Sequence, residues 1–125
     1  MATITPTVVD VSTDGGAQRV TWATITAADS AAAVGFPDFA HFETVSVQAT
    51  GTFDSGSVAM HGTIDGTNFA ALTAVGGTSA FALSAAGIKG VNERTLQLKP
   101  VITGGTGAQS ITVTMLLVRS NPMRT

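Results

Sequence analysis

Cysteine is absent from this chain, which excludes a disulfide framework and any metal site built on thiolate ligands. Long apolar runs are absent too, because no stretch approaches the roughly 18 residues that a membrane-spanning helix requires. The segment MATITPTVVDV has neither the basic start nor the apolar centre of a secretory signal peptide, so none is expected. The 125 residues suffice for one domain with its own hydrophobic core.

Charged residues are scarce. Asp, Glu, Lys and Arg make up 11% of the chain, against about 25% in an average domain. The formal net charge is -2 and no cluster of Lys or Arg occurs, so the sequence offers no electrostatic footprint for nucleic acid. Two explanations stay open. Threonine hydroxyls face water in place of charges, or much of the surface is buried against neighbouring proteins, because interface cores are depleted of charge.

Metal-binding patterns are missing as well. His41 and His61 are the only histidines, and they do not stand in a metal-ligand spacing. His61 falls on the polar face of a predicted strand, which favours a solvent-facing or interface position. Asp65 precedes a glycine and is expected to form a turn through its carboxylate, since the residues after it lack the calcium-loop pattern. No metal and no cofactor are predicted.

Catalytic patterns are equally absent. Glu43 and Glu93 are the only glutamates, and nothing in the sequence places them together as a general acid and base. The glycine-rich run at 104–107 is neither a P-loop nor a dinucleotide-binding motif, and no G-x-S-x-G nucleophile motif is present. We therefore expect a protein that is not an enzyme.

The sequence is rich in alternation of apolar and polar residues, the period of a half-buried β-strand. From Glu43 to Phe53 one face is apolar or small and the other carries hydroxyl or amide groups, and the run from Ser57 to Ile64 alternates again. The turn residues Asp54-Ser55-Gly56 lie between these runs, so the two runs are predicted to form a hairpin. Further strands are predicted at Arg19–Thr26, Asn68–Leu72, Ala80–Ser84, Asn92–Thr103 and Ser110–Ser120.

Seven or eight short strands with glycine-rich turns predict an all-β protein. The expected fold is a single-domain antiparallel β-sandwich, jelly-roll or immunoglobulin-like, with an extended N-terminal arm. Residues 1–18 are interpreted as arm and edge strand, 19–120 as the sandwich and 121–125 as a tail. Residues 27–39, between two predicted strands, are interpreted as a long loop that is functional or packs on a neighbour.

The alternation also predicts which residues are buried. Pro100 lacks an N–H, so its strand is expected to lie at a sheet edge or to bulge there. Leu116 and Val118 make the last strand apolar on both faces, which predicts a central strand or one covered on its second side. Phe42, Phe69 and Phe81 are expected in the core. The core between two sheets is predicted to contain Val45, Val47, Phe53, Met60, Ile64, Leu96, Leu98, Ile111, Val113 and Met115.

Two stretches resemble a known family. Residues 46–53, SVQATGTF, and residues 62–72, GTIDGTNFAAL, are similar to segments of small virion structural proteins of tailed bacteriophages. Thr63 stands where that family more often has Ser, and Phe69 where Trp is commoner. Residues 93–119 continue the likeness, with Glu93, the run Leu96–Pro100, the turn at Gly104-Gly105 and a threonine-alternating strand that ends near Arg119.

The resemblance implies a non-enzymatic head decoration (cement) protein. Such a protein binds the outer surface of the major capsid protein lattice and stabilises the head, and it is made in the host bacterial cytoplasm. The resemblance further implies a homo-oligomer, a trimer. Nucleic acid and membrane are not expected partners. The predicted interface residues, on the terminal segments, the 27–39 loop and the end of the last strand, are Ile4, Pro6, Val8, Phe36, Phe39, Arg119, Met123 and Arg124.

Two other functions stay open at this point. A tail or adaptor structural protein could use the same kind of β-sandwich, because fold alone does not decide function. A carbohydrate- or receptor-binding module of the virion would need exposed aromatic residues together with acidic or amide groups on one concave face.

Overall fold

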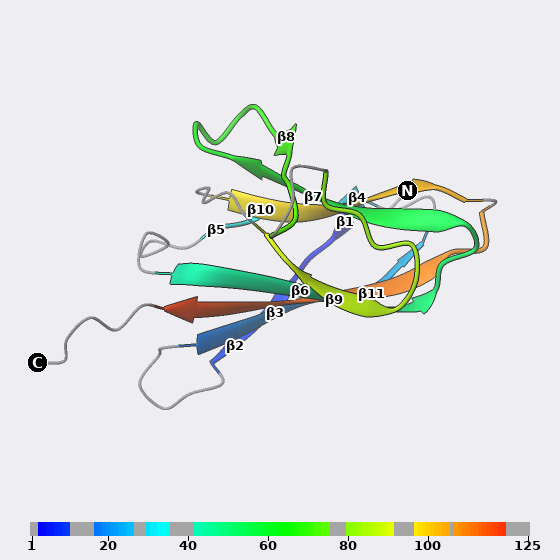
Figure 1. Ribbon diagram of the computed structural model, residues 1–125, viewed down its shortest axis with the longest axis horizontal. Helices are drawn as coiled ribbons and strands as arrows, with labels where there is room; N and C mark the ends of the chain where they lie inside the picture. Colours follow the sequence, from blue (N-terminus) through cyan, green and yellow to red (C-terminus); the bar gives the residue numbers. More distant parts are fainter. Residues whose placement is uncertain are drawn as a thin grey trace, which may run out of the picture.

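The structure is a computed structural model, and it describes residues 3–10, 17–26, 30–35, 42–75, 80–91, 97–105 and 107–119. These residues form strands and turns, and the two larger sheets pack as layers (Figure 1). The structure therefore confirms the predicted all-β class with antiparallel sheets. Within the described residues, seven strands have four or more residues and four have only two.

A five-stranded sheet forms one layer, in the order β2-β3-β11-β6-β9. All its neighbouring strands are antiparallel. β11 lies between β3 and β6 along nearly its whole length, which confirms that the last strand is central. The strands are β2 (Thr7–Asp10), β3 (Ala17–Thr26), β11 (Ser110–Arg119), β6 (Phe42–Thr52) and β9 (Gly87–Gly90).

A four-stranded sheet forms the other layer, in the order β5-β10-β7-β8. The strands are β5 (Val34–Gly35), β10 (Gln97–Gly104), β7 (Gly56–Thr63) and β8 (Ala70–Ala71). β5 pairs only with Gln97 and Leu98, so within the described residues no strand pairs with that edge of β10 at Pro100. The missing N–H of Pro100 therefore breaks no ladder there, as its sequence position indicated.

The predicted hairpin is wrong. The turn at Asp54 and Ser55 is tight, with the Gly56 N–H donating to the Phe53 carbonyl at 2.7 Å. The two strands that it joins nevertheless belong to different sheets. β11 pairs with one edge of β6, β9 pairs with the other edge from Ser46 to Ala49, and β7 pairs with β10 instead. The turn carries the chain from one layer to the other.

One hydrophobic cluster fills the space between the layers. Five side chains that enter it from the five-stranded sheet, all but the first predicted there, are Trp22, Val47, Ile111, Val113 and Met115. The other layer contributes Val58, Met60, Leu98 and the loop residues Leu72, Phe81 and Leu83. Val45 is also buried, Phe53 is half-buried against the cluster, and Leu96 lies outside the described residues.

Ile64 is not in the core, contrary to the prediction, and its side chain is 71% exposed. β7 ends at Thr63, and the chain then turns, so the period of two no longer sets the direction of the next side chain. Thr63 is buried in its place, with its hydroxyl donating to Asp65 Oδ1 at 2.8 Å.

Segments expected to be irregular are partly paired. Between residues 27 and 39 the chain forms β4 (Ser30–Ala31) and β5, so its described part, residues 30–35, is not one long loop. β4 pairs in parallel with β1 (Thr3–Ile4), and β2 is the edge strand of the five-stranded sheet. The described N-terminal residues thus lie on the sheets of their own chain. The predicted strand 80–84 is reduced to isolated bridges, at Ala80 and Leu83.

Candidate interaction surface

The outer face of the five-stranded sheet, the face turned away from the core, carries an unusual set of side chains. On β11, Val113, Met115 and Leu117 are buried, and the intervening Leu116 and Val118 are each 38% exposed. Contiguous exposed apolar side chains, unlike single ones, gather at sites of interaction. Among the described residues, the central strand is therefore covered on one side only.

The register places further side chains beside Leu116. Leu116 lies opposite Arg19 on one side and opposite Ser46 on the other. Arg19 in turn lies opposite Val9, whose side chain is 41% exposed. The adjacent row across the sheet contains Thr7, Thr21, Thr114, Gln48 and Ile88.

A groove of about 350 Å³ lies on this face, and we call it the Arg19 groove. Ile88, 65% exposed on the edge strand β9, forms one side, and Leu116 contributes from the central strand. Of the described residues that line it, Arg19 alone carries a charge. The lining residues are Arg19, Ser46, Gln48, Ile88, Thr114 and Leu116.

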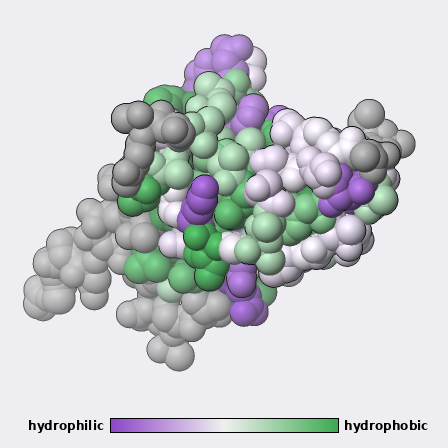
Figure 2. All heavy atoms as spheres, turned by 45° about the vertical axis from the view of Figure 1, so that its right-hand side comes forward, coloured by the Kyte–Doolittle hydropathy of each residue, from purple (hydrophilic) through white to green (hydrophobic). Residues whose placement is uncertain are grey.

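The Arg19 side chain is exposed, and no hydrogen bond or ion pair joins it to another side chain in the described part of the chain. A guanidinium has five N–H donors in a fixed plane, which suits a carboxylate. The groove thus presents a cation next to apolar and hydroxyl-bearing side chains. Figure 2 shows one face of the molecule, on which strongly hydrophilic residues form a few separate groups among neutral and apolar ones.

The outer face of the four-stranded sheet differs, because its cation is already engaged. Lys99 Nζ lies 4.4 Å from the centroid of the Phe69 ring, a cation–π contact. Phe69 is therefore half-buried on the outer face rather than in the core, contrary to the prediction. His61 lies opposite Lys99 across the ladder, on the polar face as expected. Burial, and then the charge of Lys99, lower the pKa of His61.

Asp65 forms the turn that its sequence position predicted. Its Oδ1 accepts from the backbone N–H groups of Thr67 and Asn68, each at 2.8 Å, and Oδ2 accepts from the Asn68 side chain at 2.8 Å. These bonds hold the pKa of Asp65 well below its usual range. Among the described residues no group of three or more His, Cys, Asp or Glu side chains is placed to hold a metal ion.

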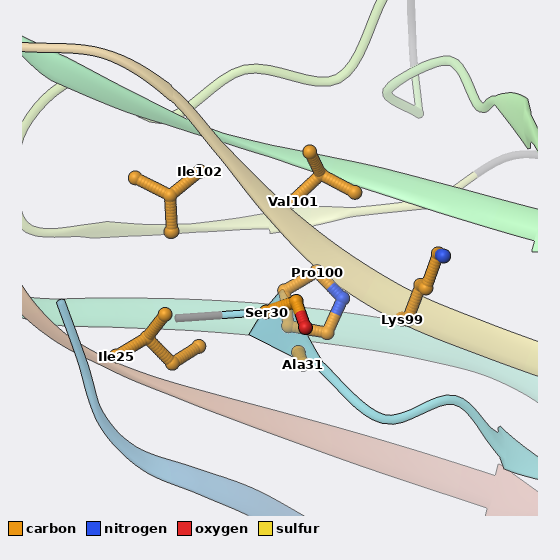
Figure 3. A pocket seen from close by; sticks show the side chains of 7 residues that line it. All are labelled: Ile25, Ser30, Ala31, Lys99, Pro100, Val101 and Ile102. Atoms are coloured by element: carbon orange, nitrogen blue, oxygen red, sulfur yellow. The ribbon is translucent and has the colours of Figure 1, made fainter. Parts of the chain in front are cut away.

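A smaller hollow, of about 180 Å³, lies between β10 and the chain around β4 (Figure 3). The Pro100 ring lies beside Ser30 and Ala31, and Ile25 approaches from β3. In Figure 3 the Lys99 amine points away from Pro100, Ser30 and Ala31, so the side chains that line the hollow point no charged group into it. This hollow marks the open edge of β10 and brings no reactive groups together.

The structure describes the side chains of three of the predicted interface residues. Ile4 is half-buried and packs against the core of its own chain, Pro6 is half-buried between β1 and β2, and Val8 is exposed. Arg119 ends β11, and its side chain is not described. Phe36, Phe39, Met123 and Arg124 lie outside the described residues. That the eight residues form one interface stays a prediction.

The residues that do form one surface were not singled out from the sequence as interface residues. They are Val9, Arg19, Ile88, Leu116 and Val118. The signal for Leu116 and Val118 was present, since both faces of the last strand read as apolar. Arg19 and Ile88 carried no signal of their own, because their neighbourhood depends on the pairing of β3 with β11 and of β9 with β6.

Comparison with known proteins gives a likeness of fold. No protein-family model matches this chain, and no curated protein sequence matches it. Among solved structures, the crystal structure of the SPBc2 prophage-derived protein YomS is similar, with a TM-score of 0.59 over 82% of this chain and 94% of that chain. The two sequences are 14% identical. No described helix is long and apolar enough to span a membrane.

Proposed function

We propose that this chain is a structural protein of a tailed-phage virion, and more specifically a capsid decoration (cement) protein on the outer surface of the head. The observation that carries the proposal is the fold shared with a prophage-derived protein across most of both chains. The virion-like segments at 46–53 and 62–72 support it independently, because they were read from the sequence alone.

The surface supports an assembled state. Only 11% of the residues are charged, and the outer face of the five-stranded sheet exposes Val9, Ile88, Leu116 and Val118. Burial of apolar surface drives protein association, and interface cores are poor in charge. The proposed partners are the major capsid protein and other copies of this chain, as a trimer.

The proposed role is not enzymatic. Glu43→Gln, Glu93→Gln, His41→Ala and His61→Ala should each leave the biological activity intact, apart from effects on stability or assembly. Particle infectivity and head stability of the four variants would be compared with wild type. A hydrolytic activity of the protein that any one of these substitutions abolishes would contradict the proposal.

The function is tested by adding the purified protein to heads that were assembled without it. We expect saturable binding to the heads and a higher temperature of genome release, because a ligand that binds only the intact lattice stabilises it by mass action. Isolated tails and glycan-coated beads serve as controls. Binding to tails or to glycans but not to heads would replace decoration by a tail role or a receptor-binding role.

A further inference from the structure

We propose that the Arg19 groove is the surface that seats the protein on its partner, and that its occupant is an extended partner segment with a carboxylate beside apolar side chains. The proposal rests on the proposed function, since it names the contact surface and the chemistry of the partner. Neither the sequence resemblance nor the likeness of fold assigns this face a role.

The charge of the groove indicates an acidic occupant. Arg19 is the one charged residue among the described residues that line the groove, and no described side chain pairs with it. A partner that covers the groove takes the guanidinium out of water. Such a burial is unfavourable unless a carboxylate accepts its hydrogen bonds. The occupant must therefore bring an Asp or Glu side chain.

The other side chains that line the groove suit an extended peptide. Ile88 and Leu116 offer apolar surface, while Ser46, Gln48 and Thr114 offer hydroxyl and amide groups. These groups suit the alternating side chains and the backbone of an extended peptide. No aromatic ring is among the described lining residues, so the groove lacks the stacking platform that a sugar ring prefers.

One way in which a second copy of this chain could cover the groove is unfavourable. A two-fold packing of this face on itself would place one Arg19 groove over another, because a two-fold interface uses the same patch on both subunits. The two guanidinium groups would then face each other, and like charges across an interface are unfavourable. A segment of another protein meets no such repulsion.

The experiment uses full-length variants and heads assembled without the protein. Arg19→Glu and Leu116→Asp should each weaken binding by about tenfold or more. Arg19→Glu would place a carboxylate opposite the carboxylate of the partner, and Leu116→Asp would place a carboxylate against its apolar side chains. Lys99→Glu and Ile64→Asp are matched controls, with the same changes of charge on the opposite sheet and on an exposed turn. These controls should bind within about threefold of wild type. Equal binding of wild type and groove variants would overturn the proposal, as would equal loss in groove variants and controls.

Salt dependence provides a milder test that does not depend on reversing a charge. Wild-type affinity should fall as salt rises, because an ion pair at the interface is screened. Arg19→Gln changes an exposed side chain, and it should bind more weakly at low salt and show a flatter salt dependence. Unchanged salt dependence in Arg19→Gln would contradict the ion pair.

Photo-crosslinking separates failure of this proposal from failure of the proposed function. A benzophenone amino acid at Thr114 in the groove, or at Val101 on the other sheet, is introduced during particle production. Thr114 should crosslink to a peptide of another protein that contains Asp or Glu beside apolar residues, and Arg19→Glu should abolish that adduct. If the peptide belongs to a tail protein, the groove is confirmed and decoration is wrong. An adduct to a second copy of this chain, or none, overturns the groove.

Discussion

At the scale of single residues, Trp22 links β3 of the five-stranded sheet to the segment between β4 and β5. Its side chain is fully buried, and its Nε1–H donates to the Ala32 carbonyl at 2.8 Å. Trp22→Phe keeps a ring in the core but leaves that carbonyl without this donor. We expect a loss of about 1–3 kcal/mol in the free energy of unfolding from the bond alone, measured by urea denaturation. A loss below about 0.5 kcal/mol would show that water replaces the indole N–H.

Two phenylalanines provide a graded test of burial. Phe81 is 1% exposed in the cluster, so Phe81→Ala should cost about 3–5 kcal/mol. Phe53 was predicted to be buried to the same degree, but it lies half-buried at the turn between β6 and β7. Phe53→Ala should therefore cost clearly less than Phe81→Ala in the same denaturation assay. The reverse order would contradict the placement of the two rings.

His61 makes stability depend on pH. Because burial and Lys99 lower its pKa in the folded state, the unfolded chain takes up a proton first as pH falls below about 6.5. The stabilising effect of the neutral imidazole is thus complete above that pH and is lost on acidification. His61→Gln should lose less stability than wild type between pH 7.5 and 5.5, measured by denaturation at both values. Parallel losses in the two proteins would show that His61 has the same pKa folded and unfolded.

At the scale of elements, a glycine allows β6 to lie close to β11. Gly51 has φ +119°, and a Cβ there would lie 2.2 Å from the Ser110 carbonyl oxygen on β11. Gly51→Ala should cost about 2–5 kcal/mol, because backbone strain and overpacking add. Gly66 has φ +83° with open space around it, so Gly66→Ala should cost only about 1–2 kcal/mol. Thermal denaturation compares the pair, and similar melting temperatures would contradict the close approach of β6 to β11.

β3 contains a bulge opposite β11, where Thr24 has φ +57°. Its N–H donates to Thr112 Oγ1 at 3.3 Å. A β-branched residue in the left-handed region costs about 1–2 kcal/mol, more than glycine costs in a strand, about 0.5–1 kcal/mol. Thr24→Gly is therefore expected to preserve or raise stability, whereas Thr26→Gly, its control within β3, should lower it. Equal losses in urea denaturation would mean that Thr24 is not strained.

The sequence predicted elements better than it predicted their pairing. The central place of β11 followed from Leu116 and Val118, and the edge at Pro100 followed from its missing N–H. The hairpin failed because Asp54 and Ser55 favour a tight turn without determining which strands it joins. That depends on the strands that neighbour β6, which are β9 and β11, and no strand was predicted over the residues of β9.

For the candidate site, too, the sequence predicted single strands better than the pairing between them. Alternation identifies which side chains of one strand leave the core, and it succeeded for β11. It does not identify which strands lie side by side. Alternation therefore cannot place Arg19 and Ile88 near Leu116, because that neighbourhood depends on the register of the sheet. Ile64 and Phe69 were misplaced for a related reason, because each lies where a strand has ended or in the turn beyond it.

At the scale of the whole molecule, the outer faces of the two sheets differ. They differ in whether the charged side chain has a partner among the described residues and in whether large apolar side chains are exposed. On the four-stranded sheet, Lys99 lies over Phe69. On the five-stranded sheet, Arg19 has no partner among the described residues, and Leu116 and Val118 remain exposed. This asymmetry distinguishes the face proposed to meet the capsid from the face proposed to meet solvent.

The most direct test of this account is an electron cryomicroscopy map of the native particle, with its copies of this protein counted and oriented. We predict many copies on the outer surface of the head, repeated on the quasi-symmetric lattice, with the outer face of the five-stranded sheet against the major capsid protein. A few copies on the tail, or head-bound copies that turn Arg19 and Leu116 toward solvent, would contradict the account.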